Sequence, residues 1–451
     1  MIRTVASILT SLMRNYFPST FVFAVLLTPL SMVLALLFTG AAFSAILESW
    51  ASGFFNILTF AMQIILILVT GHALALSPPA ERLLDGIAGR GRTPVQGVML
   101  VMFVGITGSL VNWAFGLFFA GLLALEVAKR TPRSDYPLLI AAAYSGQICW
   151  HQGLSGFIPL VLATPDHPQN FAYQFTGISV PLSQTIFQPY SFVPVLVLVA
   201  SLPFLMALIH PRGDGVTEIP PEVLQVLSGE KIVEEKLRNF TWSEKIDQSP
   251  LVSTVFVAIG VAYLSFHFYR KGPDLNINII ILILFVLGVM LHGRPVHYVR
   301  GTGIAIRGAG GIAVQFPLYG GIMGILSGTG LGGIIAGWFV ALSMPETAYL
   351  MQFLGTGLLN IFVPSGGGQW AIQGPITLEA VRLIGLDTPR SAMMVAWGNQ
   401  WTNMIQPFWA LPLLGLAGLT AKDILGYTAM TFLWSGVVFS TFALLIGYHI
   451  L

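Results

Sequence analysis

The feature that most constrains this chain is a series of long apolar stretches separated by short polar ones. A membrane-spanning helix needs about 20 predominantly apolar residues. Charged residues make up 9% of the 451 residues, whereas an ordinary soluble domain has about 25%. The sequence therefore predicts an all-α polytopic membrane protein. Its expected crossings are 20–39, 54–76, 136–165, 192–210, 250–268, 276–291, 308–341, 391–417 and 424–448.

Two further apolar stretches, 95–128 and 347–385, are too long for one upright helix. Each has polar or glycine-rich residues at its centre, in the strings "TGSLVNW" and "VPSGGGQW". Irregular backbone at membrane depth is tolerated only inside protein or beside a water-filled cavity. We therefore expect both stretches to form re-entrant helical hairpins, which enter and leave the membrane on the same side.

The basic residues indicate the orientation of the chain. With a cytoplasmic N-terminus, 17 of the 21 lysines and arginines fall in inside segments, as the positive-inside rule favours. This layout opens the hairpin 95–128 to the cytoplasm and the hairpin 347–385 to the outside. It also makes the polar stretch 211–248 a cytoplasmic linker between an N-terminal repeat, 1–210, and a C-terminal repeat, 249–451.

The two halves contain matching strings. "AYSGQICWHQGLSGFIPL" (143–160) aligns without a gap to "AWGNQWTNMIQPFWALPL" (396–413), and the hairpin tips match as "NWAF" and "QWAI". We interpret these matches as an internal duplication. The crossing 250–268 has no counterpart in the first half. This additional crossing makes the second copy run through the bilayer in the opposite direction to the first. The sequence thus predicts two inverted-topology repeats, with broken transmembrane helices at 136–165 and 391–417.

Inverted repeats with broken helices near the midplane are typical of secondary transporters. We expect the binding site where the two hairpin tips and the two broken helices converge. No Asp, Glu, Lys or Arg lies in the middle of these elements, so a small monoanion is the expected ligand, bound by helix N-terminal amides and neutral donors. The predicted substrate-binding residues are Ser109, Asn112, Trp113, Ser145, Gln147, His151, Gln152, Ser365, Gly367, Gly368, Gln369, Trp370, Asn399, Gln400, Thr402 and Asn403.

These residues also have structural interpretations. The amides could cap broken helices, and the tryptophans, including Trp150 and Trp401, could be packing residues. His151 could be a structural hydrogen bonder or a proton carrier, because an imidazole exchanges protons near neutral pH. His151 has no acidic partner in its span, so an intramembrane enzyme is disfavoured. The single Cys149 excludes an internal disulfide and a multi-cysteine metal site. No metal, cofactor or nucleic-acid partner is expected.

Three strings, "SLVNWAFGL" (109–117), "AYSGQICWHQGLSGFIPLVLATP" (143–165) and "FVPSGGGQWAIQGP" (362–375), resemble the bacterial short-chain fatty acid transporters, permeases associated with acetoacetate and butyrate uptake. The resemblance runs essentially end to end. It implies uptake of short monocarboxylates across the bacterial inner membrane.

The layout also resembles, more distantly, the ion transporter superfamily, which includes sodium-coupled dicarboxylate carriers. This second resemblance implies an elevator-type transporter and a homodimer in the lipid bilayer. The tips of that superfamily typically read Ser-Asn-Thr, whereas here they read Ser109-Leu-Val-Asn112 and Ser365-Gly-Gly-Gly-Gln369. The departure leaves the coupling ion, proton or sodium, open.

The sequence therefore predicts a secondary active transporter of butyrate- or acetoacetate-like monocarboxylates, working by cation symport and alternating access. The main alternative is a sodium-coupled carrier of another small organic anion, such as a dicarboxylate. A passive channel is a further alternative, which non-saturating uptake that ignores ion gradients would favour.

Overall fold

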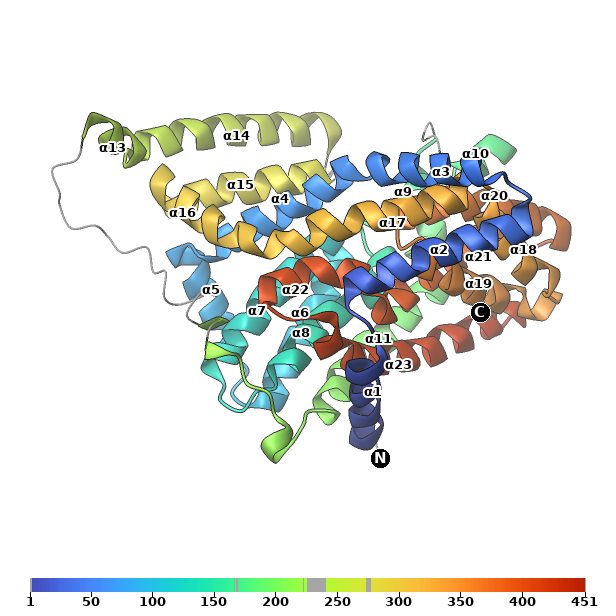
Figure 1. Ribbon diagram of the computed structural model, residues 1–451, viewed down its shortest axis with the longest axis horizontal. Helices are drawn as coiled ribbons and strands as arrows, with labels where there is room; N and C mark the ends of the chain where they lie inside the picture. Colours follow the sequence, from blue (N-terminus) through green and yellow to red (C-terminus); the bar gives the residue numbers. More distant parts are fainter. Residues whose placement is uncertain are drawn as a thin grey trace.

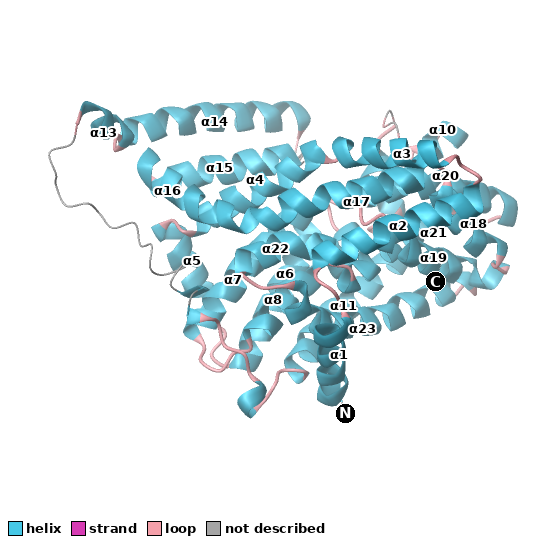
Figure 2. Cartoon of the chain, in the orientation of Figure 1, coloured by secondary structure: helices cyan, strands magenta, loops and turns pink. Residues whose placement is uncertain are grey.

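The computed structural model describes residues 2–165, 167, 169–221, 223–224, 241–272 and 277–450. Every regular element in these ranges is a helix, and Figure 2 shows short loops joining them. Part of the expected linker, 225–240, lies outside the described residues. Seven of the described helical segments are long and apolar enough to cross a membrane: Thr20–Thr39, Phe43–Ala75, Pro94–Val111, Pro189–Leu208, Pro250–Lys271, Pro295–Gly328 and Ala421–Gly447. The protein is thus an all-helical polytopic membrane protein.

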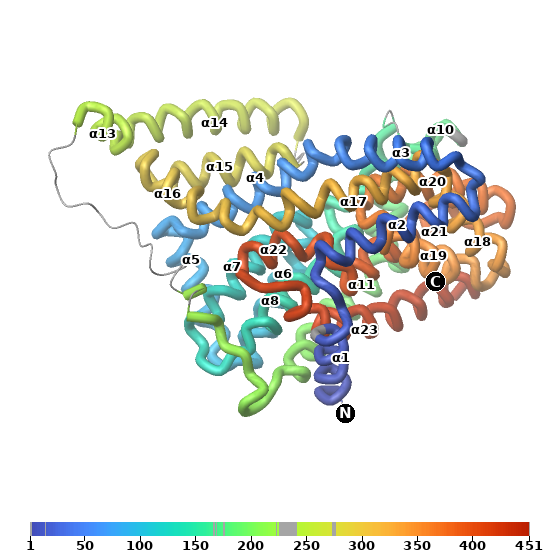
Figure 3. Tube along the Cα trace, in the orientation of Figure 1, coloured from blue at the N-terminus to red at the C-terminus, as the bar shows by residue number. Residues whose placement is uncertain are grey.

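The helices fall into two groups in space (Figure 1). One group, along the upper side of the view, contains α2 (Thr20–Thr39), α3 (Phe43–Asn56), α4 (Leu58–Ala75), α14 (Pro250–Lys271), α15 (Ile277–His292), α16 (Pro295–Ala305) and α17 (Gly310–Gly328). Figure 3 traces the chain from this group into the other one and back again. The second group contains the two hairpins and the broken helices, together with α11 (Pro189–Leu208) and α23 (Ala421–Gly447).

Most long crossings begin and end within a few residues of their expected positions, but the crossing 308–341 was wrong. Residues 310–341 form two helices, α17 and α18 (Leu331–Ala341), with Gly330 between them at φ +78°. That left-handed conformation is easily adopted only by glycine. The low helix propensity of the Gly-Thr-Gly sequence before α18 favours the break. Residue 54 likewise does not begin a helix, because α3 starts at Phe43 and continues into α4.

Glycines allow α3 and α17 to pack backbone against backbone. A Cβ atom added to Gly53 would lie 2.6 Å from the Cα of Gly324, and one added to Gly320 would lie 2.6 Å from the backbone oxygen of Gly53. In lipid, helices associate mainly through such close packing of small residues. Larger side chains at these positions would force the two helices apart.

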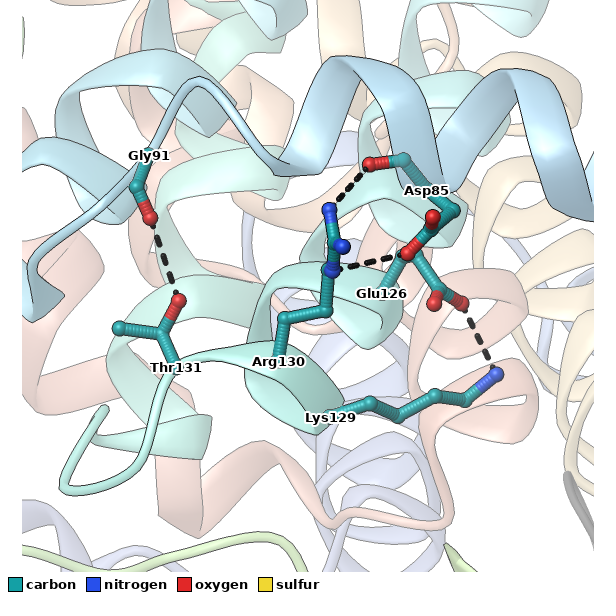
Figure 4. Close-up of polar contacts among 6 residues, drawn as sticks. All are labelled: Asp85, Gly91, Glu126, Lys129, Arg130 and Thr131. Atoms are coloured by element: carbon teal, nitrogen blue, oxygen red, sulfur yellow. Dashed lines mark hydrogen bonds and ion pairs between the residues drawn. The ribbon is translucent and has the colours of Figure 1, made fainter.

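Polar contacts tie the base of the first hairpin to α5 (Pro78–Ala88), as Figure 4 shows. The hairpin consists of α6 (Pro94–Val111) and α7 (Trp113–Arg130). Arg130 at the end of α7 donates to the Asp85 backbone oxygen at 2.9 Å and forms an ion pair with the Asp85 carboxylate at 2.8 Å. Thr131 donates to the Gly91 oxygen at 3.2 Å. The contacts join α7 to the segment that precedes α6.

An additional helix, α1 (Ile2–Tyr16), was not expected from the sequence. It packs against the first part of α23, where Gly426 leaves room for Thr10. Figure 1 shows α1 at a steep angle to α2. Two short helices, α10 (Phe171–Thr176) and α13 (Trp242–Asp247), lie in connecting segments.

Candidate functional site

Each helical hairpin has a polar residue at its tip that begins the second helix. In the first hairpin Asn112 caps α7, and its side-chain oxygen accepts from the amides of Ala114 at 3.0 Å and Phe115 at 3.1 Å. The second hairpin consists of α19 (Ala348–Phe362) and α20 (Gly366–Ile384). Ser365 caps α20 by accepting from the Gly368 amide at 3.3 Å. Both caps satisfy backbone donors that a helix N-terminus otherwise leaves unpaired.

The helix after each hairpin is interrupted. The first, α8 (Tyr136–Ser145), tightens into the 3-10 helix η1 (Gly146–Gln152) and resumes as α9 (Phe157–Ala163). The second, α21 (Thr388–Thr402), passes through η6 (Asn403–Ile405) and η7 (Phe408–Ala410) into α22 (Leu411–Ala417). The order hairpin, helix, break and short helix therefore occurs twice in the chain.

Both interrupted helices also begin in the same way. Asp135 caps α8 by accepting from the Leu138 amide at 2.9 Å, and Asp387 caps α21 by accepting from the Arg390 amide at 3.1 Å. A proline stands two residues after each aspartate. Sequence comparison of the halves missed this correspondence.

The first tip lies against the first break. Ser109 donates to the Gly146 oxygen at 2.7 Å, and the Gln147 amide donates to the Trp113 oxygen at 3.1 Å. The Trp113 amide in turn donates to Ser155 at 2.9 Å, a residue that the predicted site omits. These contacts bring Ser109, Asn112, Trp113 and Gln147 together at the first tip.

The second tip lies against the second break through a buried chain of amides. Asn399 of α21 donates to the Gln369 side-chain oxygen at 2.7 Å and to the Asn360 oxygen at 2.8 Å. Asn360 donates to the side chains of Thr402 at 3.0 Å and Asn403 at 2.8 Å. All five side chains are at most 3% exposed. Asn360, in the middle of this chain of amides, was not among the predicted site residues, although it is a polar residue in an apolar stretch.

The two breaks cross each other. The His151 imidazole lies 3.1 Å from the Asn399 side-chain oxygen, and the His151 backbone amide donates to Gln400 at 3.0 Å. The Tyr144 hydroxyl donates to the Asn403 oxygen at 2.8 Å. Residue numbers rise along one segment as they fall along the other, so the segments run antiparallel. Gln152 joins the crossing through a 2.6 Å contact with Gln400.

Some predicted site residues point elsewhere. Ser145 accepts from Thr431 of α23 at 3.0 Å. The Trp370 indole donates to the Gln169 oxygen at 2.9 Å, away from the amide chain. Trp401, which directly follows Gln400, stacks on Phe432, with ring centroids 4.4 Å apart. These contacts favour the structural interpretation of the three residues in the conformation described.

A cavity of about 580 Å³ lies between α3, α17 and the second tip. Ser365 and Gly368 of the tip line it. Besides Ser365, its walls combine four apolar side chains with five polar ones, and its volume is usual for a small-molecule site. The apolar side chains are Ile57, Phe60, Met323 and Phe408, and the polar ones are Glu48, Ser49, Ser52, Asn56 and Ser327. Sequence analysis missed the α3 and α17 residues, because hydropathy does not show which helices face a site.

Among the described residues, no group of three or more histidine, cysteine, aspartate or glutamate side chains is placed to hold a metal ion. The polar groups at the crossing are instead neutral amides, hydroxyls and one imidazole. Such groups can bind an anion or a hydrated cation without forming a permanent charge in the membrane.

A polytopic bundle in which hairpin tips meet interrupted helices is the architecture of a membrane transporter. Residues 1–446 match the family described as "Short chain fatty acid transporter", and the chain belongs to that family. The prediction of this family from the sequence is confirmed, and the protein is a transporter rather than an enzyme.

Two bacterial relatives cover almost the whole chain. The chain is 40% identical over 439 residues to a protein of Escherichia coli (strain K12) named, provisionally, as a short-chain fatty acid transporter; the match covers 97% of this chain and 98% of the relative. A relative of Haemophilus influenzae with the same provisional name is 38% identical over 445 residues, with the same coverage.

Two solved structures are similar over most of their length. The Alcanivorax borkumensis YdaH transporter is 17% identical, with a TM-score of 0.43, over 96% of this chain and 99% of that one. Neisseria gonorrhoeae MtrF is 15% identical, with a TM-score of 0.44, over 97% of each chain.

Proposed function

We propose that this protein takes up butyrate- or acetoacetate-like monocarboxylates across the bacterial inner membrane by cation symport and alternating access. Family membership supports the substrate class. The observation that carries the site is the cavity beside the second hairpin tip, which Ser365 and Gly368 line together with apolar side chains of α4, α17 and η7. A short carboxylic acid has the same division between a charged head and an apolar tail.

The carboxylate is proposed to bind at the N-terminus of α20. The first amides of a helix have no partner within it, and the helix dipole favours an anion there. Gly366, Gly367 and Gly368 add no side chains of their own at this helix end, and Gly368 lines the cavity. The hydrocarbon tail then lies among Phe60, Met323 and Phe408. A dicarboxylate would place its second charge against this apolar wall, which disfavours the dicarboxylate alternative.

The other predicted site residues support the tip in this proposal. Gln369 donates to the Thr356 oxygen at 2.8 Å and accepts from Asn399, so its amide is engaged on both sides. Gly366 lies so close to His151 that an added Cβ would be 3.0 Å from the imidazole. The tip therefore contacts both breaks. It stays a prediction that the other predicted site residues contact the substrate directly in another state of the transport cycle.

The repeated order of elements and the antiparallel crossing support two inverted repeats. We propose that the hairpins and broken helices move as one body against the group that contains α3 and α17, in an elevator motion. The substrate cavity lies between these two groups. Such a motion would expose the cavity to each side in turn. The cytoplasmic N-terminus and the homodimer remain part of this proposal.

Glu48 is proposed to bind the coupling cation. Its side chain lines the same cavity as Ser365. An ionised carboxylate there repels the carboxylate of the substrate, and a bound proton or sodium ion removes the repulsion. Binding of the cation thus favours binding of the substrate, which is the linkage that symport needs.

Uptake of radiolabelled butyrate by proteoliposomes containing the wild-type protein tests the substrate class. We expect saturable uptake that unlabelled acetoacetate inhibits and succinate does not. Strong inhibition by succinate without inhibition by acetoacetate would favour a dicarboxylate carrier. Uptake that fails to saturate would favour a channel.

A further inference from the structure

A second cavity, of about 560 Å³, lies between α1, the loop that follows α11, and the first part of α23. It shares no lining residue with the substrate cavity. Helix α1 contributes Arg3, Ser7 and Thr10, and the loop contributes Arg212 and Thr217. The cavity thus combines two guanidinium groups with several hydroxyl groups.

The positive charge of this cavity is not neutralised by the described residues. Neither Arg3 nor Arg212 forms an ion pair with any of them. The Nε atom of Arg3 is buried and has no hydrogen-bond partner there. The neighbouring Asp135 carboxylate is engaged elsewhere, because its oxygens accept from the Leu138 amide and the Thr217 amide, each at 2.9 Å. A buried donor without a partner is costly unless a ligand satisfies it.

The position of the cavity suits a ligand at the membrane surface. Helix α1 is amphipathic: the exposed apolar residues Ile8 and Leu12 lie outside the cavity lining, whereas Ser7 and Ser11 line the cavity. An amphipathic helix of this kind can lie at the boundary between headgroups and acyl chains. The expected topology places α1, the loop after α11 and the start of α23 all on the cytoplasmic side.

We propose that this cavity binds a phosphate group. The forked donors of arginine match phosphate oxygens, and serine and threonine hydroxyls add further donors. The phosphate belongs either to the headgroup of an anionic phospholipid or to a free phosphate compound. In both cases the ligand would hold α1 against α23 and against the end of α11. In the sequence, α11 follows the first broken helix and α23 follows the second.

The test uses the full-length protein and three variants. Arg3→Gln with Arg212→Gln removes both charges, and Arg3→Lys with Arg212→Lys keeps the charges but removes the forked donors. Arg82→Gln is the matched control, because Arg82 is an exposed arginine of α5 outside the cavity. Native mass spectrometry measures retention of phosphatidylglycerol and of phosphatidylcholine. Thermal unfolding in inorganic phosphate and in chloride of equal ionic strength measures binding of free phosphate.

If a lipid headgroup is the ligand, the wild type and Arg82→Gln retain phosphatidylglycerol about fivefold better than the double glutamine variant, and the double lysine variant is intermediate. Phosphatidylcholine retention is then the same in all proteins. If free phosphate is the ligand, it raises the unfolding temperature of the wild type and the control by about 2 °C and leaves the double glutamine variant unchanged. Equal phosphatidylglycerol retention together with equal phosphate shifts in all four proteins would overturn the proposal. The double lysine variant keeps the test valid if the glutamine variant fails to fold.

Discussion

His151 and Asn399, which come from opposite halves of the chain, meet side chain to side chain at 3.1 Å, and neither has any exposed surface. His151 lies in the first broken helix and Asn399 in the second. Asn399 also holds Gln369, and therefore the second hairpin tip. This contact joins the two breaks to each other and, through Gln369, to the tip beside the proposed substrate cavity.

Replacing Asn399 by alanine should weaken the connection between these elements, while the Tyr144 and Gln400 contacts remain. The change leaves the side-chain oxygens of Gln369 and Asn360 without their donor in a fully buried position. Hydrogen bonds between membrane helices contribute about 0.6 kcal/mol each and up to about 1.7 kcal/mol, so the three lost contacts should destabilise the protein by about 2 kcal/mol. We expect a lower unfolding temperature and about tenfold slower butyrate uptake.

The matched control is Gln96→Ala, which removes an exposed amide at the base of the first hairpin. We expect a change of at most about 0.5 kcal/mol there, as for most surface substitutions. Similar losses of unfolding temperature and of butyrate uptake in both variants would show that the buried chain of amides has no special role in stability or transport.

Ser365→Ala should weaken substrate binding more than it weakens the fold. The change removes the N-cap of α20, which accepts from Gly368, at a cost of about 1 kcal/mol. Because the cap orients the amides proposed to hold the carboxylate, KM for butyrate should rise about fivefold. Ser327→Ala is the control, since Ser327 lines the same cavity but donates within its own helix. An unchanged KM in Ser365→Ala would contradict the placement of the carboxylate.

Met323→Ala should extend the range of acids toward longer chains. The Met323 side chain lines the cavity, and its terminal methyl group lies next to Gly368. Each additional buried CH₂ group contributes about 0.8 kcal/mol once there is space for it. Hexanoate, which is two CH₂ groups longer than butyrate, should therefore compete with butyrate up to about fifteenfold better in this variant than in the wild type. Met62→Ala, at an exposed position of α4, should leave the chain-length preference unchanged. The same preference in all three proteins would exclude Met323 from the substrate wall.

Glu48→Gln and His151→Gln separate the two candidates for cation coupling. Glu48 lines the cavity, whereas His151 is fully buried in the crossing and contacts Asn399 and the Trp150 ring. Uptake by Glu48→Gln should no longer respond to imposed proton or sodium gradients. His151→Gln should keep the response, because glutamine can replace the hydrogen bond to Asn399. The reverse pattern would assign the coupling to His151.

The sequence predicts the elements of the site better than their arrangement. The polar strings around Asn112 and Ser365 indicate the tips, because a polar residue followed by small or apolar ones is a helix N-cap signal. The glycines around Gly146 and Gly153 indicate the first break. The long apolar runs define most crossings, since composition alone decides whether a helix is compatible with lipid.

The arrangement depends on packing, which hydropathy does not record. Nothing in the sequence around Ser49 or Met323 shows that α3 and α17 face the second tip. The recurrence of Gly320, Gly324 and Gly328 at every fourth position is a signal for close helix packing that sequence analysis overlooked. The end of α17 before Gly330 was missed because an apolar run resembles one helix whether or not a glycine turns the chain.

The central claim is that the cavity beside Ser365 holds the substrate, and protection of a cysteine tests it most directly. In a Cys149→Ala background, Ser327→Cys places a thiol in the cavity wall, and Thr254→Cys places one on the exposed side of α14. The measurement is the rate at which a small maleimide labels each thiol, with and without butyrate or butylamine. The account predicts that butyrate slows labelling at position 327 by about threefold, while butylamine has no effect there and neither compound has an effect at position 254. Labelling at position 327 that is insensitive to butyrate, or equally slowed at both positions, would contradict it.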